Sequence, residues 1–344
     1  MSLVVRNGKT GHKRTKLSTV RLTCSTGDPV YTVKFNSDGS LLASGGEDRN
    51  LTIWDVNSIT PEDTEDPSGN GSEIVRPSTV EYKYQPLIHK SAVTWIEWSK
   101  ISRSLVFTSS ADGTAGLIDL TRGQKIKTFH HSGCVNQVAV SKRDMVVTCS
   151  DDGKVKTWDV RSKFPTTEIT TDYPVLTCCS DADERGLFFS GIDPSVHCYD
   201  PRDTKKPLWS ELNHSNNVTS LSLSPDSAEY LLSKSVDGTI KYFDSRFTVA
   251  NTSHRRRARP YVFDGATSTQ EDWLIRSQII KDPNGKLRVV SGSNDGFVYM
   301  WDFASRKLVA RMEGHTGSSF DIDYNQGRLA SCSIDGSLIV REIN

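Results

Sequence analysis

Apolar and polar residues alternate in short runs along this chain, a pattern typical of half-buried β-strands. Val30–Phe35 and Val218–Leu223 are two such runs. In Leu231–Asp244 one run reaches Asp237-Gly238, and a second alternating run follows at once. Asp-Gly between alternating runs indicates a tight hairpin, because glycine accepts a positive φ and aspartate tolerates one. The pattern therefore predicts an all-β fold of many short strands.

A repeat organises these strands. Seven segments end on an acid, in most cases after an aromatic or apolar residue: Trp54-Asp55, Ile118-Asp119, Trp158-Asp159, Tyr199-Asp200, Phe243-Asp244, Trp301-Asp302 and Arg341-Glu342. An aspartate precedes each of these acids by the same interval, as Asp48 precedes Asp55. We assign these aspartates a structural role in the hairpin turns: Asp48, Asp112, Asp152, Asp193, Asp237, Asp295 and Asp335. Proline cannot adopt a positive φ, so Pro194 predicts a different turn with its strands retained.

Histidines introduce the runs upstream of several hairpins, at His89, His131, His214 and His315. This G-H…W-D pattern resembles the WD40 repeat family, whose members are β-propellers with four strands per blade. The resemblance implies a seven-bladed WD40 β-propeller. In that family the histidine, a serine or threonine, the turn aspartate and the tryptophan form a buried hydrogen-bond network. Here we expect that network to be complete only in blade three, through His131, Asp152 and Trp158.

The ring needs one more strand to close. The last β-like run, Leu338–Ile343, would be the third strand of blade seven, so an N-terminal strand within Ser18–Cys24 is expected to complete this blade. Val20 and Leu22 would pack there. The propeller is therefore assigned to residues 18–344, after a basic tail at 1–17 that we expect to be disordered.

Two blade connections are longer than the others. Residues 57–85, between blades one and two, form an acidic insert that is expected to be a solvated loop or to mask a basic partner. Residues 247–272, between blades five and six, form a basic insert. Its arginines are either part of a solvated or sorting segment or contacts for RNA or protein: Arg255, Arg256, Arg257 and Arg259.

Composition narrows the range of functions. Lys plus Arg and Asp plus Glu number 42 each, so no global charge attracts the chain to nucleic acid or a membrane. The sequence contains no phosphate-binding loop, no G-x-S-x-G elbow and no H-E-x-x-H helix. Adjacent residues on a strand point to opposite faces, so His130-His131 is a poor metal pair. We expect no enzyme activity, no metal, no cofactor and no small-molecule substrate.

Three segments resemble repeats of the WD40 subunits of the spliceosomal U5 small nuclear ribonucleoprotein: Val175–Arg202, His214–Arg246 and Gly296–Ser318. This resemblance implies a non-catalytic protein-interaction scaffold in the nucleus, acting in pre-mRNA splicing. Its implied partners are the large central scaffold protein of the spliceosome and other U5 proteins. RNA would be contacted indirectly, or through the basic tail and insert.

A partner would dock on the face that holds the starts of the inner strands and the tight turns. By register, that face should display Tyr31, Glu47, Thr94, Asn136, Asp151, Leu176, Ile192, Thr219, Asn294 and Asp321. Two other functions remain open. The W-D-x-R arginines, Arg161, Arg202 and Arg246, resemble the docking motif of substrate receptors for cullin-type ubiquitin ligases. The basic insert would instead suit an RNA-binding propeller.

Overall fold

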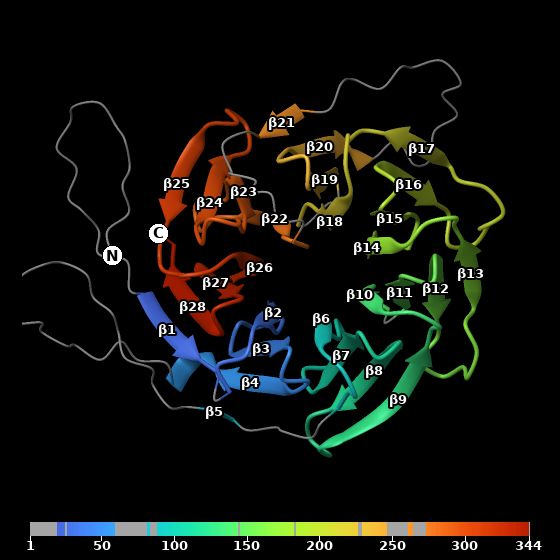
Figure 1. The fold of residues 1–344 in the computed structure, drawn as a ribbon, viewed down its shortest axis with the longest axis horizontal. Helices are drawn as coiled ribbons and strands as arrows, with labels where there is room; N and C mark the ends of the chain where they lie inside the picture. Colours follow the sequence, from blue (N-terminus) through green and yellow to red (C-terminus); the bar gives the residue numbers. More distant parts are fainter. Residues whose placement is uncertain are drawn as a thin grey trace, which may run out of the picture.

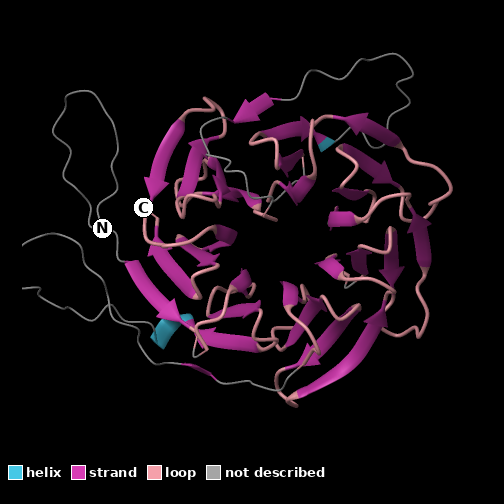
Figure 2. Cartoon of the chain, in the orientation of Figure 1, coloured by secondary structure: helices cyan, strands magenta, loops and turns pink. Residues whose placement is uncertain are grey.

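Seven four-stranded antiparallel sheets stand around a central axis in the computed structural model of this protein (Figure 1). The structure describes residues 19–24, 26–58, 81–82, 88–143, 145–181, 184–225, 229–245, 261–263 and 273–343. Among these residues, helix is limited to short 3-10 turns such as η1 (Val56–Ser58), and strands dominate the drawing in Figure 2. Within the same ranges, no helix is long and apolar enough to cross a membrane. The prediction of an all-β, seven-bladed propeller is confirmed.

The strands of each blade are ordered from the centre of the ring outward. Blade one holds β2 (Val30–Phe35), β3 (Leu41–Gly46), β4 (Leu51–Asp55) and β5 (Glu81–Tyr82). Blade two holds β6 (Val93–Trp98), β7 (Leu105–Ser110), β8 (Thr114–Asp119) and β9 (Gln124–His130). Blade three holds β10 (Val135–Val140), β11 (Val146–Ser150), β12 (Lys154–Trp158) and β13 (Thr167–Thr170).

The remaining blades have the same order. Blade four holds β14 (Val175–Ser180), β15 (Leu187–Gly191), β16 (Ser195–Tyr199) and β17 (Trp209–Leu212). Blade five holds β18 (Val218–Leu223), β19 (Tyr230–Ser235), β20 (Ile240–Asp244) and β21 (Tyr261–Phe263). Blade six holds β22 (Ser277–Lys281), β23 (Leu287–Ser291), β24 (Val298–Asp302) and β25 (Leu308–Met312). Blade seven holds β26 (Ser319–Asn325), β27 (Arg328–Ser333), β28 (Ser337–Glu342) and, outermost, β1 (Thr19–Thr23).

Blade seven joins the two ends of the described chain. Strand β1 pairs antiparallel with β28, from Thr19 opposite Arg341 to Thr23 opposite Ser337. Val20 and Leu22 are buried in one apolar cluster with residues of blades one and seven. The predicted closure by an N-terminal strand is confirmed, and β1 and β28 lie side by side in Figure 1.

The tight turns follow one rule. In all seven blades, the turn aspartate accepts a hydrogen bond from the backbone N–H two residues later, at 2.9 to 3.2 Å. The five glycines after these aspartates have positive φ, and Arg49 adopts φ 63° at the same place in blade one. At Pro194 the turn differs, yet β15 and β16 stay paired from Leu187–Tyr199 to Phe189–His197. The aspartate therefore sets the turn, and the following residue adapts to it.

The core lies between blades. One cluster joins Phe107, Leu117 and Phe129 of blade two to Val138 and Trp158 of blade three. Each fully buried side chain of this size contributes about 1.5–3 kcal/mol to folding. Because every blade packs on both of its neighbours, the ring is stable as a closed unit.

Part of each long connection forms an outer strand. Strand β5 pairs with β4, although it lies within the acidic insert assigned to 57–85. Strand β21 pairs with β20 within the basic insert assigned to 247–272, and Phe263 packs against Trp301 with ring centroids 6.3 Å apart. Most other residues of the two inserts lie outside the described residues.

Candidate protein-binding face and central channel

The tight turns and the starts of the inner strands form one face of the ring, here called the turn face. In blades one to five and seven, the residue before the turn aspartate donates its N–H to the carbonyl just before or within the start of the inner strand. Glu47 N to Pro29 O measures 3.0 Å, and Asp151 N to Cys134 O measures 2.9 Å. The loops at the other ends of the strands form the opposite face.

Four blades bury a histidine beneath the turn face. In blade three, His131 Nδ1 lies 3.0 Å from Asp152 Oδ2, His131 Nε2 lies 2.7 Å from Thr148 Oγ1, and Trp158 Nε1 donates to Thr148 Oγ1 at 2.8 Å. This network is the complete one that the sequence predicts. These partners fit a neutral ring that donates from Nδ1 to the carboxylate and accepts at Nε2.

Blade two keeps the network without its tryptophan. His89 Nδ1 is 3.1 Å from Asp112 Oδ2 and its Nε2 is 2.8 Å from Thr108 Oγ1, but Ile118 occupies the position of Trp158. Burial lowers the pKa of His89 to about 4, with Lys125 adding to the effect. Burial alone would raise the pKa of Asp112, but hydrogen bonds from Thr114 and the Lys90 amide lower it to about 2. The pair is thus a neutral imidazole beside a carboxylate, which suits a structural role.

Related networks lie in blades five and seven. His214 contacts Asp237 and Ser233, at 3.0 and 2.7 Å. His315 contacts Ser337 and Ser331, each at 2.8 Å. Burial lowers the pKa of His315, as it does that of His131. None of these imidazoles is exposed in its side chain.

The ten residues proposed for partner binding all belong to the turn face, but they are not equally accessible. Glu47, Asp151 and Ile192 are exposed, and Tyr31, Thr94, Leu176 and Asn294 are half-buried. Three were expected to be displayed and are buried instead: Asn136 is 7 %, Thr219 5 % and Asp321 1 % exposed. That expectation of display is corrected for these three residues.

Three of these turn-face residues donate hydrogen bonds to the next blade. Asn136 Nδ2 donates to Val175 O at 2.9 Å, and Thr219 Oγ1 donates to Ile275 O at 2.8 Å. Thr94 Oγ1 likewise donates to Val135 O at 2.5 Å. Each lies where the inner strand has a register shift, which turns the side chain sideways toward the next blade.

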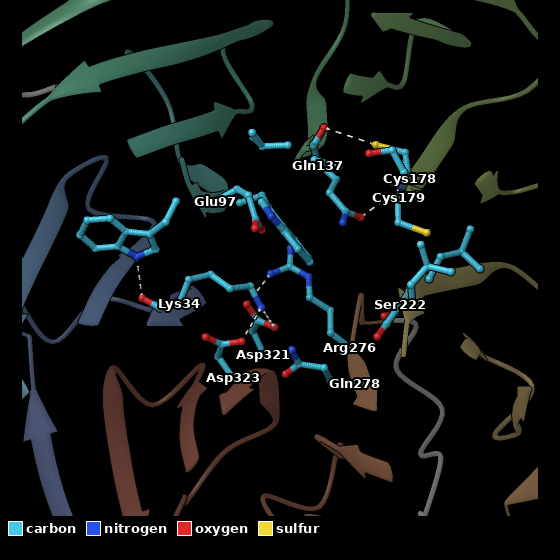
Figure 3. Close-up of a pocket in the computed structure, with 18 of the residues that line it drawn as sticks. Lys34, Glu97, Gln137, Cys178, Cys179, Ser222, Arg276, Gln278, Asp321 and Asp323 are labelled. Carbon is cyan, nitrogen blue, oxygen red and sulfur yellow. Dashed lines mark hydrogen bonds and ion pairs between the residues drawn. The ribbon is translucent and has the colours of Figure 1, made fainter. Parts of the chain in front are cut away.

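A central channel lies along the axis of the ring. Its cavity of about 860 Å³ is lined by residues of all seven inner strands. Figure 3 shows Arg276 reaching toward Asp321, with Lys34 beside them. Arg276 Nη1 is 3.2 Å from Asp321 Oδ2, and Lys34 Nζ is 3.3 Å from Asp321 Oδ1. Burial raises the pKa of Asp323 to about 6, although Lys34 opposes this shift.

Arg276 connects four blades. It precedes β22 of blade six, pairs with Asp321 of blade seven, and donates to Tyr31 O of blade one at 2.9 Å and Thr94 O of blade two at 2.6 Å. Its guanidinium lies 4.1 Å from the centre of the Trp95 ring. Only 8 % of its surface is exposed, so Arg276 has a structural role: it links blades on different sides of the channel.

Three aromatic rings form a cluster on the turn face, near the starts of the inner strands of blades one and seven. Phe320 packs edge-on against Tyr31 and Trp273, with centroids 5.5 and 5.4 Å away. Tyr31 donates its hydroxyl proton to Glu47 at 2.9 Å, and burial together with this carboxylate raises the pKa of Tyr31 to about 12. Trp273 and Leu274 are 36 % and 37 % exposed, so they add apolar surface to this face.

Arg276, Trp273, Leu274 and Phe320 were missed as site residues. The sequence did contain one signal for Arg276. The residues expected at the inner-strand starts include one from every blade except blade six, and Arg276 lies at the start of the inner strand of that blade. Strand β22 has no register shift, unlike the other six inner strands, so a comparison with the other blades would not have aligned it directly.

The basic residues proposed to contact RNA or protein are not among the described residues. Arg255, Arg256, Arg257, Arg259 and the tail at 1–17 lie outside the described residues, as does Arg246. Of the other W-D-x-R arginines, Arg161 binds the carboxylate of Asp159 through Nε and Nη2, at 3.0 and 2.7 Å, while 90 % of its side chain is exposed. Among the described residues, no group of three His, Cys, Asp or Glu side chains could hold a metal ion.

Comparison with known proteins agrees with this geometry. The family model described as "WD domain, G-beta repeat" matches residues 15–55, 123–159, 205–244 and 270–302. Together with the ring of seven four-stranded blades, the match defines a WD-repeat β-propeller.

Individual relatives narrow the assignment. The U5 small nuclear ribonucleoprotein 40 kDa protein of Dictyostelium discoideum is 32% identical over 91% of this chain and 81% of its own length. The human protein of that name is 30% identical over 91% of this chain and 81% of its own. Pre-mRNA-splicing factor cwf17 of Schizosaccharomyces pombe is 30% identical over 92% and 85%. The chain belongs to the WD40 family that contains the U5 small nuclear ribonucleoprotein 40 kDa proteins.

Proposed function

We propose that this protein is a non-catalytic scaffold subunit of a U5-type ribonucleoprotein in the nucleus, acting in pre-mRNA splicing. The observation that carries the proposal is the similarity to splicing proteins over nine-tenths of the chain. The buried histidines support it, because each is hydrogen-bonded to structural partners within its own blade rather than open to a substrate.

The turn face is the proposed docking surface for the large central scaffold protein of the spliceosome or another U5 protein. It offers exposed Ile192, Trp273 and Leu274 together with the carboxylates of Glu47 and Asp151. A mixture of exposed apolar side chains and polar groups is typical of a protein interface. RNA would then be held through the partner, or through the basic tail and insert.

The ubiquitin-ligase alternative has weaker support. Arg161 is bound by Asp159 within its own turn, and the Arg202 N–H is bound by Asp200. The contact through its guanidinium gives Arg161 a local role in shaping its own loop.

Affinity purification of the tagged full-length chain from nuclear extract at moderate salt tests the proposal. We expect U5 RNA and the large scaffold protein to be recovered together. A cullin adaptor recovered without spliceosomal RNA would overturn the splicing function. RNA bound by the purified protein alone, and lost as salt rises, would support direct RNA binding instead.

A further inference from the structure

The opposite face carries a cavity beneath blade three that the proposed function does not use. Its volume is about 600 Å³. Half-buried Leu105, Met145 and Val160 lie along it, and Phe107 and Trp158 form its buried floor. A side chain that filled this space would be removed from water on mostly apolar walls, at about 25 cal/mol for each Å² buried.

Three arginines also line this cavity: Arg143, Arg161 and Arg202. They come from three different loops, which follow β10, β12 and β16. Arg161 is paired with Asp159. Neither Arg143 nor Arg202 has a carboxylate partner for its guanidinium among the residues that the structure describes. Two guanidinium groups beside an apolar cavity can each receive a carboxylate in a bidentate geometry.

The acids nearest to the cavity already have partners. Asp159 binds Arg161, and Asp200 accepts the backbone N–H of Arg202 at 2.9 Å. Glu184 accepts a hydrogen bond from Ser141 Oγ at 2.6 Å. Three arginines and two acids, Asp159 and Glu184, line the cavity, so its lining carries one excess positive charge.

An exposed aromatic residue stands on one of these loops. Phe164 is 70 % exposed and follows Arg161 in the connection between β12 and β13, and Lys163 Nζ lies 6.0 Å from the centre of its ring. A large exposed apolar side chain next to a lysine, on a loop that also lines the cavity, is typical of an interface.

We propose that this cavity docks an acidic segment of a second partner protein, which inserts an aliphatic side chain and places carboxylates at Arg143 and Arg202. The rings of Phe107 and Trp158 are 0 % and 4 % exposed, so bases cannot stack on them as they do in single-stranded nucleic-acid sites. The site is independent of the turn face, and its failure would leave the proposed function unchanged.

A binding titration with the full-length chain tests the site. The probe is a short fluorescent peptide in which glutamates alternate with leucines, compared with one that has serine at each leucine. We expect saturable binding of the leucine peptide and weakening by at least about tenfold in the double variant Arg143→Glu, Arg202→Glu, because both carboxylate contacts are reversed in sign. The serine peptide should bind weakly to every variant, because it lacks the anchor.

The matched control is Lys205→Glu with Lys206→Glu, which makes the same change in net charge in the loop that carries Arg202, outside the cavity lining. Screening by salt should limit its effect to about twofold. Equal loss in both double variants, equal binding of both peptides, or no saturable binding to the wild type would overturn the proposal. Tighter binding of a single-stranded oligouridylate that displaces the leucine peptide would also overturn it. If the charge reversal lowers the melting temperature, Arg143→Gln with Arg202→Gln tests the same contacts by removing the positive charges without adding negative ones.

Discussion

The turn face and the opposite face of this ring use their polar side chains differently. On the turn face, Thr94, Asn136 and Asp321 are bonded to a neighbouring blade, and Arg276 joins blade six to blades one, two and seven. On the opposite face, Arg143 and Arg202 have no carboxylate partner within the described ranges, and Phe164 is exposed.

This difference shows that position on a binding face does not make a residue a binding residue. A substitution at Asn136 or Asp321 would weaken the ring and its docking surface together. A substitution at Arg202 or Ile192 changes the surface with little effect on the fold, so it can isolate binding. The predictions below test this division, from the largest expected effect to the smallest.

Arg276→Leu should have the largest effect on stability. It leaves the buried carboxylate of Asp321 with Lys34 as its remaining ion-pair partner and removes the bonds to two backbone carbonyls. Breaking a buried pair in this way costs about 3–5 kcal/mol. The control Arg202→Leu on the opposite face should change stability by about 0.5 kcal/mol or less. Chemical denaturation measures both, and similar losses would contradict the division between the faces.

Thr148→Val in blade three should have an intermediate effect. It removes the partner of both His131 Nε2 and Trp158 Nε1, so we expect a loss of about 2–3 kcal/mol. Thr108→Val in blade two removes the partner of His89 alone and should cost about 1–2 kcal/mol. If denaturation curves rank the two variants in the reverse order, the tryptophan does not strengthen the network.

The burial of His89 predicts a pH dependence of stability. The pKa of His89 is about 4 in the folded protein, against about 6.5 when unfolded. The unfolded chain therefore binds more protons between these values, and stability present above pH 6.5 is lost as the pH falls. Going from pH 7.5 to 5 should cost about 2 kcal/mol through His89. Asp323, with a pKa raised to about 6, opposes this trend over part of the range.

Nuclear magnetic resonance can resolve the two contributions, because the imidazole of His89 titrates separately. A midpoint near pH 4 is expected. A midpoint near 6.5 would mean that the ring is open to water and that the network is not intact in solution.

The sequence predicts the strands, the tight turns and the closure of the ring well, and the reason is physical. The seven turn aspartates act within their own hairpins, so their role can be read from local spacing, and the missing fourth strand of blade seven follows from the repeat. The burial of Asn136, Thr219 and Asp321 could not be read in this way. Register places them at the inner-strand starts, but the local irregularity of each strand, which the sequence does not announce, turns their side chains toward the next blade.

The role of Arg276 could not be predicted from the sequence either. Its role depends on contacts with blades one, two and seven, more than 180 residues away in the chain for Thr94 and 245 for Tyr31. No local pattern encodes such contacts, and the long connection before blade six hides its place in the repeat. The residues that follow the repeat rule could therefore be placed at the inner-strand starts from the sequence, and Arg276 could not.

The measurement that tests the central claim most directly is purification from nuclear extract with two surface variants beside the wild type. Ile192→Glu with Leu274→Glu alters the exposed apolar part of the turn face, and Lys205→Glu with Lys206→Glu alters the opposite face. The account predicts U5 RNA and the large scaffold protein with the wild type and the second variant, and their loss with the first. Absence of U5 RNA from the wild-type purification, or its undiminished recovery with the turn-face variant, would contradict it.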